Sequence, residues 1–101
     1  MPAALSPNEI FQHLTALNAV LDRPWSLRDD ALTKTFEFRD FAQTFAVMTR
    51  VAAAAEAMNH HPDWTQNFKR LHVELSTHDV GGLTEKDFRL AAEVERCASE
   101  A

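Results

Sequence analysis

The stretch Glu56-Ala57-Met58-Asn59-His60-His61-Pro62-Asp63-Trp64 separates the longest helical pattern of the chain from a strand pattern. Apolar residues recur at helical spacing before it, so a helix is predicted from Phe41 to Asn59. Pro62 ends this helix, because proline has no N–H and its ring pushes the preceding residue toward extended geometry. We therefore expect His61 to lie outside the helix, with the rings of the two adjacent histidines pointing in different directions.

Downstream of this stretch, the sequence predicts two strands and a helix. Trp64 to Phe68 is a weak strand pattern, whereas Leu71 to Ser76 alternates apolar and polar residues, as a half-buried strand does. An irregular junction follows, Thr77-His78-Asp79-Val80-Gly81-Gly82-Leu83-Thr84, and it contains a third histidine. Thr84 and Asp87 then form a capping box, which predicts the start of the last helix.

Upstream, another capping box, Ser6-Pro7-Asn8-Glu9, predicts a first helix, with Ile10, Phe11, Leu14, Leu17 and Leu21 on its apolar face. Trp25-Ser26-Leu27 is a short candidate strand, and Leu32 to Phe38 alternates as a second one. Lys34 interrupts the apolar face of that run, which indicates a sheet edge or a strand end. Asp40 is a candidate N-cap for the helix that begins at Phe41. An apolar stripe follows in that helix, consisting of Phe41, Phe45, Met48, Ala52, Ala55 and Met58.

The elements therefore follow the order helix, strand, strand, helix, strand, strand, helix. Hairpins separated by helices are typical of an α+β fold, here a four-stranded antiparallel sheet with helices packed on one face as a two-layer sandwich. A length of 101 residues suits one domain, residues 1–101. The second sheet face is expected to be partly exposed unless another subunit covers it.

Composition excludes several classes of protein. The net charge of -5 argues against a nucleic-acid-binding surface and against binding to anionic membranes. The one cysteine, Cys97, is expected to be an ordinary reduced thiol. Met1-Pro2-Ala3-Ala4-Leu5 has neither the basic flank nor the apolar run of a signal peptide, so a cytoplasmic location is predicted.

Three histidines at two irregular junctions suggest a proton-transfer site, because the unperturbed pKa of imidazole is about 6.5. The simpler alternative is that one of the adjacent rings bonds to backbone and the other is solvated. A zinc site is a third interpretation, but adjacent side chains diverge and no His-x3-His or Cys-x2-Cys spacing supports it. We therefore expect no metal and place His60, His61 and His78 in the candidate catalytic set.

Two carboxylates could support these rings. Glu56 lies four residues before His60, so in a continuous helix it could orient that imidazole, or it could be a solvated charge. Asp87 could be a cap partner only, or it could also assist catalysis. We expect Asp63 to be solvated and Trp64 to be a pocket wall or a core residue.

These motifs together resemble one family, the pterin-4a-carbinolamine dehydratases. The matching segments are Phe36-x-Phe38-x-Asp40-Phe41, Glu56-x-x-Asn59-His60-His61-Pro62-x-Trp64 and Thr77-His78-Asp79-x-Gly81-Gly82-Leu83-Thr84, with Phe45, Met48 and Arg50-Val51 between the first two and Asp87 after the third. Val80 stands where animal members commonly have cysteine. The combination of the second and third segments is far more specific than either of them alone.

The resemblance implies dehydration of 4a-hydroxytetrahydropterin to quinonoid dihydropterin, without a cofactor, which recycles the pterin of an aromatic amino acid hydroxylase. It also implies a homodimer or homotetramer. The implied catalytic residues are His60, His61 and His78, with Glu56 and Asp87 as supporting carboxylates, and Asn59, Ser76, Thr77 and Asp79 complete the implied substrate-binding set. The alternative is a binding module without catalysis, acting as a dimerisation partner or transcriptional coactivator.

Overall fold

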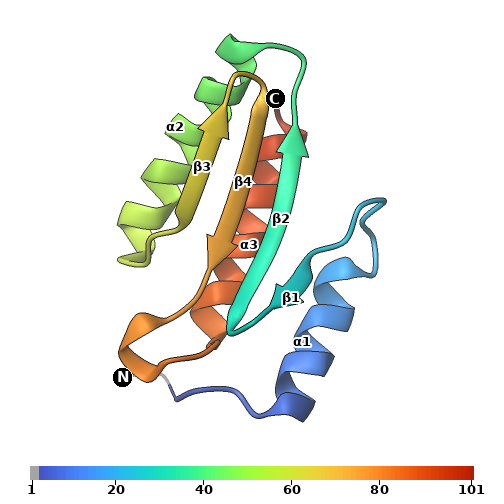
Figure 1. Cartoon of the computed structure of the whole chain (residues 1–101), viewed down its shortest axis with the longest axis vertical. Coiled ribbons are helices and arrows are strands. Elements are labelled where there is room, and N and C mark those ends of the chain that lie inside the picture. Colours follow the sequence, from blue (N-terminus) through green and yellow to red (C-terminus); the bar gives the residue numbers. More distant parts are fainter. Residues whose placement is uncertain (1–2) are drawn as a thin grey trace.

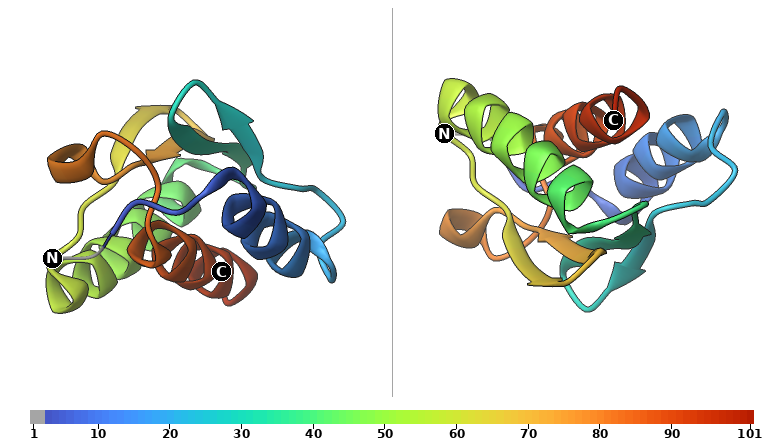
Figure 2. Two further views of the ribbon diagram at one scale, coloured as in Figure 1. Left: turned by 90° about the horizontal axis from the view of Figure 1, so that it is seen from below. Right: turned by 90° about the horizontal axis from the view of Figure 1, so that it is seen from above.

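Three helices cover one face of a four-stranded antiparallel sheet in the computed structural model, which describes residues 3–101 (Figures 1 and 2). Met1 and Pro2, which begin the predicted domain and the segment predicted not to be a signal peptide, lie outside the described residues. The elements are α1 (Pro7–Asn18), β1 (Ser26–Arg28), β2 (Ala31–Glu37), α2 (Phe41–Met58), β3 (Asp63–Asn67), β4 (Arg70–Leu75), the 3-10 turn η1 (His78–Val80) and α3 (Glu85–Ser99). The predicted α+β class and element order are confirmed.

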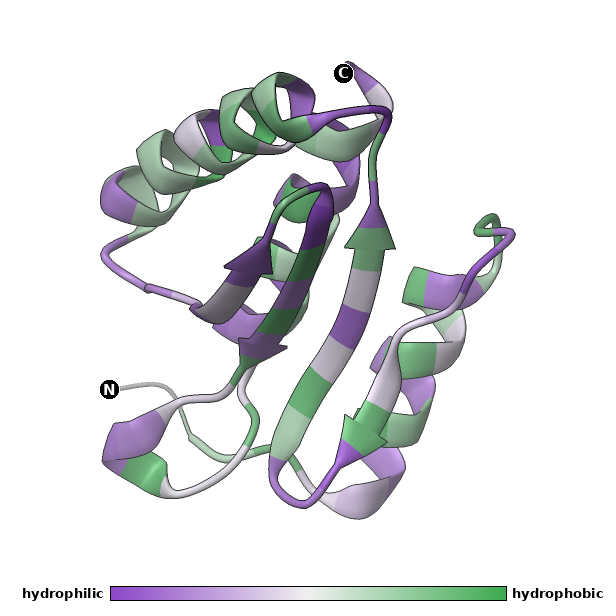
Figure 3. Ribbon diagram, turned by 45° about the horizontal axis from the view of Figure 1, so that its top comes forward, coloured by the Kyte–Doolittle hydropathy of each residue, from purple (hydrophilic) through white to green (hydrophobic). Residues whose placement is uncertain are grey.

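The strands lie in the order β1-β2-β4-β3, so β4 is paired on both sides. Leu71, Val73 and Leu75 of β4 are fully buried against the helices. His72 and Glu74 alternate with them and lie on the other sheet face, since successive side chains of a strand point to opposite sides. Figure 3 shows this alternation of polar and apolar residues along β2 and β4.

Lys34 does not end a strand, so that part of the prediction is wrong. β2 continues to Glu37, and the ammonium group of Lys34 is paired with the carboxylate of Glu95 in α3 and donates to the Arg23 carbonyl at 2.7 Å. The Trp25 indole N–H donates to the same carboxylate at 2.9 Å. The alternative, an edge, is partly correct, because β1 pairs only with residues 31–33 of β2.

The predicted apolar stripe of α2 is partly correct, because Ala55 is buried and Met48 and Met58 pack against the core, but the rest of it is rotated relative to the real core face. Thr44, Val47, Val51 and Ala55 are the buried residues, whereas Phe41 and Phe45 are 50% and 55% exposed. Both stripes have helical spacing, and spacing alone does not select between them. Phe11 of α1, also predicted to face the core, is 69% exposed.

The helix starts agree with the sequence. Ser6 and Thr84 cap α1 and α3 in capping boxes, and the Asp40 carboxylate accepts the N–H of Gln43 at the start of α2. Cys97 of α3 is buried, and its burial raises the pKa of the thiol. Within residues 3–101, no helix combines the length and apolar character needed to cross a membrane.

Candidate active site

The two adjacent histidines diverge because α2 ends in a left-handed residue. Asn59 has φ 52°, and the N–H of His60 then donates to the carbonyl of Ala55 at 3.0 Å. This turn directs His60 inward, where it is 9% exposed, while the side chain of His61 remains 56% exposed. The predicted divergence of the two rings is confirmed.

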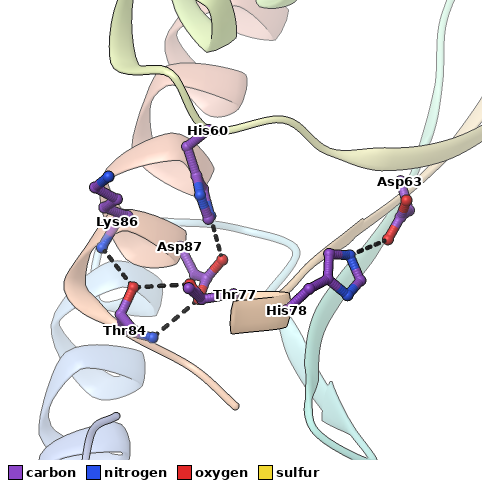
Figure 4. A network of polar contacts seen from close by, with 7 residues as sticks. All are labelled: His60, Asp63, Thr77, His78, Thr84, Lys86 and Asp87. Carbon is purple, nitrogen blue, oxygen red and sulfur yellow. Dashed lines mark hydrogen bonds and ion pairs between the residues drawn. The ribbon is translucent and has the colours of Figure 1, made fainter. Parts of the chain in front are cut away.

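His60 is held by a buried carboxylate. Its Nε2 lies 2.6 Å from Oδ1 of Asp87, whose side chain is fully buried (Figure 4). The second carboxylate oxygen accepts the hydroxyl of Thr77 at 2.8 Å and the backbone N–H of Thr84 at 2.9 Å. The two threonine hydroxyls lie 2.9 Å apart. Asp87 therefore serves both as the cap partner of α3 and as the anchor of an imidazole.

Glu56 contacts His61 and not His60, which corrects the contact that helical spacing suggested. The distance from Glu56 Oε1 to His61 Nε2 is 3.2 Å, and both side chains are exposed. The four-residue spacing brings side chains together only within a continuous helix, and α2 has ended at Met58, before His60.

His78 is the first residue of η1, the 3-10 turn that follows β4. Its Nε2 is 3.3 Å from Oδ2 of Asp63 at the start of β3, and both side chains are largely exposed. Asp63 is thus exposed, as expected, but paired with a histidine fifteen positions away, which no spacing rule indicates. Trp64 is partly buried and packs against the hydrophobic core.

One cavity of about 180 Å³ brings the predicted substrate-contacting residues together. It is lined by Asn59, His60, His61, Ser76, Thr77, His78 and Asp79. Glu56 and Asp87 do not line it, and they reach it through His61 and His60, respectively. The catalytic and binding roles of these residues remain a prediction.

Backbone geometry closes the segment that carries His78. Gly81 has φ 65°, a conformation that favours glycine, and the N–H of Thr77 donates to the carbonyl of Gly82 at 2.9 Å. This closure places Thr77 beside Asp87 and leaves His78 at the surface. A larger cavity, of about 430 Å³, lies at the free side of β2, but His72 is the only histidine that lines it.

The arrangement is suited to proton transfer. Each of the three imidazoles contacts a carboxylate through one nitrogen, which leaves the other nitrogen of each ring able to gain or lose a proton. Within residues 3–101, no three side chains of His, Cys, Asp or Glu are grouped as a metal site requires.

Comparison with known proteins identifies the family. A model described as pterin 4 alpha carbinolamine dehydratase matches residues 3–97. A Rhizobium meliloti (strain 1021) protein, provisionally named pterin-4-alpha-carbinolamine dehydratase, is 42% identical over 99 residues, covering 96% of this chain and 90% of that protein.

Two solved structures are also similar. A transcriptional coactivator/pterin dehydratase from Brucella melitensis is 35% identical, with a TM-score of 0.85, covering 94% of this chain and 98% of that one. A pterin dehydratase-like RuBisCO assembly factor of the alpha-carboxysome is 26% identical, with a TM-score of 0.61, covering 75% and 88%, respectively. The chain, with the matched fold and histidine segments, belongs to the pterin 4 alpha carbinolamine dehydratase family.

Proposed function

We propose that this protein dehydrates 4a-hydroxytetrahydropterin to quinonoid dihydropterin by histidine acid–base catalysis. The observation that carries the proposal is the convergence of His60, His61 and His78 on one cavity. Each ring also contacts a different carboxylate, so no two of the rings share a counter-ion. Membership of the family supports the choice of substrate.

The elimination requires two proton transfers. One imidazolium gives a proton to the 4a-hydroxyl group, the C4a–O bond breaks, and water leaves. A neutral imidazole takes the N5 proton, and the electron pair of that N–H bond forms the C4a=N5 double bond. His61 and His78 are the exposed rings and are suited to these steps, in either order. His60, fixed by Asp87, is suited to orienting the pterin.

The size of the cavity supports a proposal about the oligomeric state. Its volume of about 180 Å³ lies below the roughly 300–1,000 Å³ of typical ligand pockets, so one chain would enclose a bicyclic pterin only in part. We propose that the protein forms a homodimer or homotetramer.

The remaining parts of the proposal concern the cellular role. The protein would act in the cytoplasm as one domain. It would recycle the pterin of an aromatic amino acid hydroxylase and require no metal or organic cofactor.

The test is to add the purified chain to a phenylalanine hydroxylase reaction and follow the loss of the carbinolamine by absorbance. We expect loss faster than the spontaneous rate. The folded His61→Ala variant serves as the control for acceleration by protein alone. A wild-type protein that is folded and gives only the spontaneous rate would refute the proposal.

A binding role is the second candidate. The two similar structures are those of a transcriptional coactivator/pterin dehydratase and of a RuBisCO assembly factor. Phe41 and Phe45 of α2 are half-exposed, with ring centroids 6.1 Å apart, and so offer an apolar surface to a helical partner. An intact oligomer that forms a stable complex with such a partner but shows no turnover would favour this role over catalysis.

A further inference from the structure

We infer that Asp63 is a positioning residue for His78, which it holds through Nε2 so that Nδ1 is the atom that transfers the proton. The inference rests on the proposed dehydratase function and concerns a residue outside the cavity lining. Asp63 is the first residue of β3, and His78 is the first residue of η1. The ion pair therefore links a sheet strand to the turn that carries the imidazole (Figure 4).

Each of the three imidazoles of the site has a carboxylate oxygen near its Nε2, in a hydrogen bond for His60 and His61 and in an ion pair for His78. The carboxylates of Asp87, Glu56 and Asp63 lie 2.6, 3.2 and 3.3 Å from Nε2 of His60, His61 and His78, respectively. An ionised carboxylate can only accept hydrogen bonds, so it favours the tautomer that carries the proton on Nε2. The lone pair then lies on Nδ1, which becomes the available base, and in the imidazolium Nδ1–H becomes the available acid.

His78 needs such a partner more than the other two rings do. It lies in a single 3-10 turn, and its side chain is 75% exposed. Asp63, in contrast, belongs to a strand paired with β4, in which its Cα partner is Glu74. A contact with a residue fixed by the sheet favours some rotamers of an exposed imidazole over others, so the β3–β4 hairpin biases the position of the ring.

The position of Asp63 is unfavourable for the stability of the sheet. Asp63 and Glu74 are directly opposite on the same sheet face, and like charges in that relation are destabilising. Other acidic groups surround His78: Asp29 and Asp30 of the β1–β2 turn line a second cavity with it, and Asp79 follows it in η1. Within residues 3–101, however, the only ion pair of His78 is with Asp63.

The contact is long for a hydrogen bond and both groups are exposed, so its effect without ligand is small. Catalytic contacts of this kind often shorten when substrate binds and excludes water. The asparagine variant Asp63→Asn should therefore lower kcat about fivefold and leave KM unchanged. The conservative variant Asp63→Glu, which keeps the carboxylate, should recover most of the loss.

Glu74→Gln is the matched control. It removes the same charge from the same sheet face, but Glu74 pairs with His72 and not with His78. We expect its kcat to equal that of wild type. An equal loss of kcat in Glu74→Gln and Asp63→Asn would overturn the inference, because the effect would then come from the general field of the acidic face.

A second measurement does not depend on turnover. Long-range ¹H–¹⁵N NMR spectra report which ring nitrogen carries the proton when His78 is neutral, with His78→Gln used to assign the signal. In the ligand-free protein, wild type should hold the larger share of the proton on Nε2, and Asp63→Asn should show a small but measurable increase in the share on Nδ1. Equal shares would overturn the inference. A wild-type protein without dehydratase activity would refute the proposed function, and the spectra would still decide the role of Asp63.

Discussion

The two sides of the histidine cavity hold their imidazoles by different means. On one side, His60 is buried against Asp87, and Thr77 and Thr84 occupy the second carboxylate oxygen. On the other side, His61 and His78 face solvent beside carboxylates that are themselves exposed. The first group joins α2, the segment before η1 and the start of α3, whereas the second group makes contacts only at the surface.

Because of this difference, the residues that stabilise the fold are not the ones expected to transfer protons. A buried carboxylate with three hydrogen-bond donors contributes to folding, and removing it leaves those donors without a partner. An exposed ion pair contributes little to folding, so the residues that form it can serve proton transfer at small cost to the fold. Substitutions on the buried side should therefore lower stability, and those on the exposed side should lower activity.

The largest effect is expected for Asp87→Ala. The change leaves His60, Thr77 and the backbone N–H of Thr84 without their acceptor in a buried site. The free energy of unfolding should fall by about 3 kcal/mol, as measured by urea denaturation. Glu56→Ala, which removes the exposed carboxylate beside His61, is the control and should show no measurable loss. Similar losses in the two variants would remove the distinction between the sides.

The second prediction concerns the exposed side. His61→Ala should lower kcat of the proposed dehydration about 100-fold, because it removes a group that transfers a proton. Its urea midpoint should remain that of wild type, since the His61 side chain is 56% exposed. His72→Ala, on the sheet face outside the cavity, should keep wild-type kcat. A His61→Ala protein with normal turnover would show that the exposed side is not catalytic.

Local sequence signals were sufficient for the parts of the fold that depend on neighbouring residues. The alternation in β4, the capping boxes of α1 and α3 and the end of α2 shortly before Pro62 each involve residues within a few positions of one another. The divergence of His60 and His61 follows from the same helix end. These features specify the element order and place the histidine segments at junctions.

Contacts between distant segments were not available from spacing. Lys34 on the inner face of β2 is explained by Glu95, 61 positions away, and the pair between Asp63 and His78 exists only once η1 returns to β3. The contact of Glu56 with His61 depends on the left-handed backbone of Asn59, which ends the helical spacing. In each case the tertiary arrangement selects a partner among several that the sequence allows.

A smaller effect is expected for Thr77→Val, which tests how the buried side is assembled. Valine keeps the shape of threonine but removes the hydroxyl that donates to Asp87. The free energy of unfolding should fall by about 1–2 kcal/mol in urea denaturation. Thr77→Ser retains the hydroxyl and should lose less. If serine is more destabilising than valine, the methyl group contributes more at this position than the hydrogen bond to Asp87.

The smallest effect is expected at the start of α2, the helix whose end delivers both His60 and His61. The backbone N–H of Gln43 donates to the Asp40 carboxylate and, with a smaller contribution from Arg39, holds its pKa below the ordinary value of 3.8. A carboxylate with a lowered pKa in the folded state adds stability above the unfolded pKa and loses it as pH falls through the folded pKa. Asparagine caps a helix about as well but does not titrate.

Asp40→Asn should therefore be slightly less stable than wild type near neutral pH, and the difference should shrink between about pH 5 and pH 2 in urea titrations. Glu37→Gln, an exposed change just before the cap, is the control for loss of charge. The relative kcat of Asp40→Asn should equal that of wild type at neutral pH, because α2 remains anchored by its core face. A lowered kcat would mean that the cavity is sensitive to the far end of α2. The exposed His61 would then depend on the fold as closely as the buried His60 does.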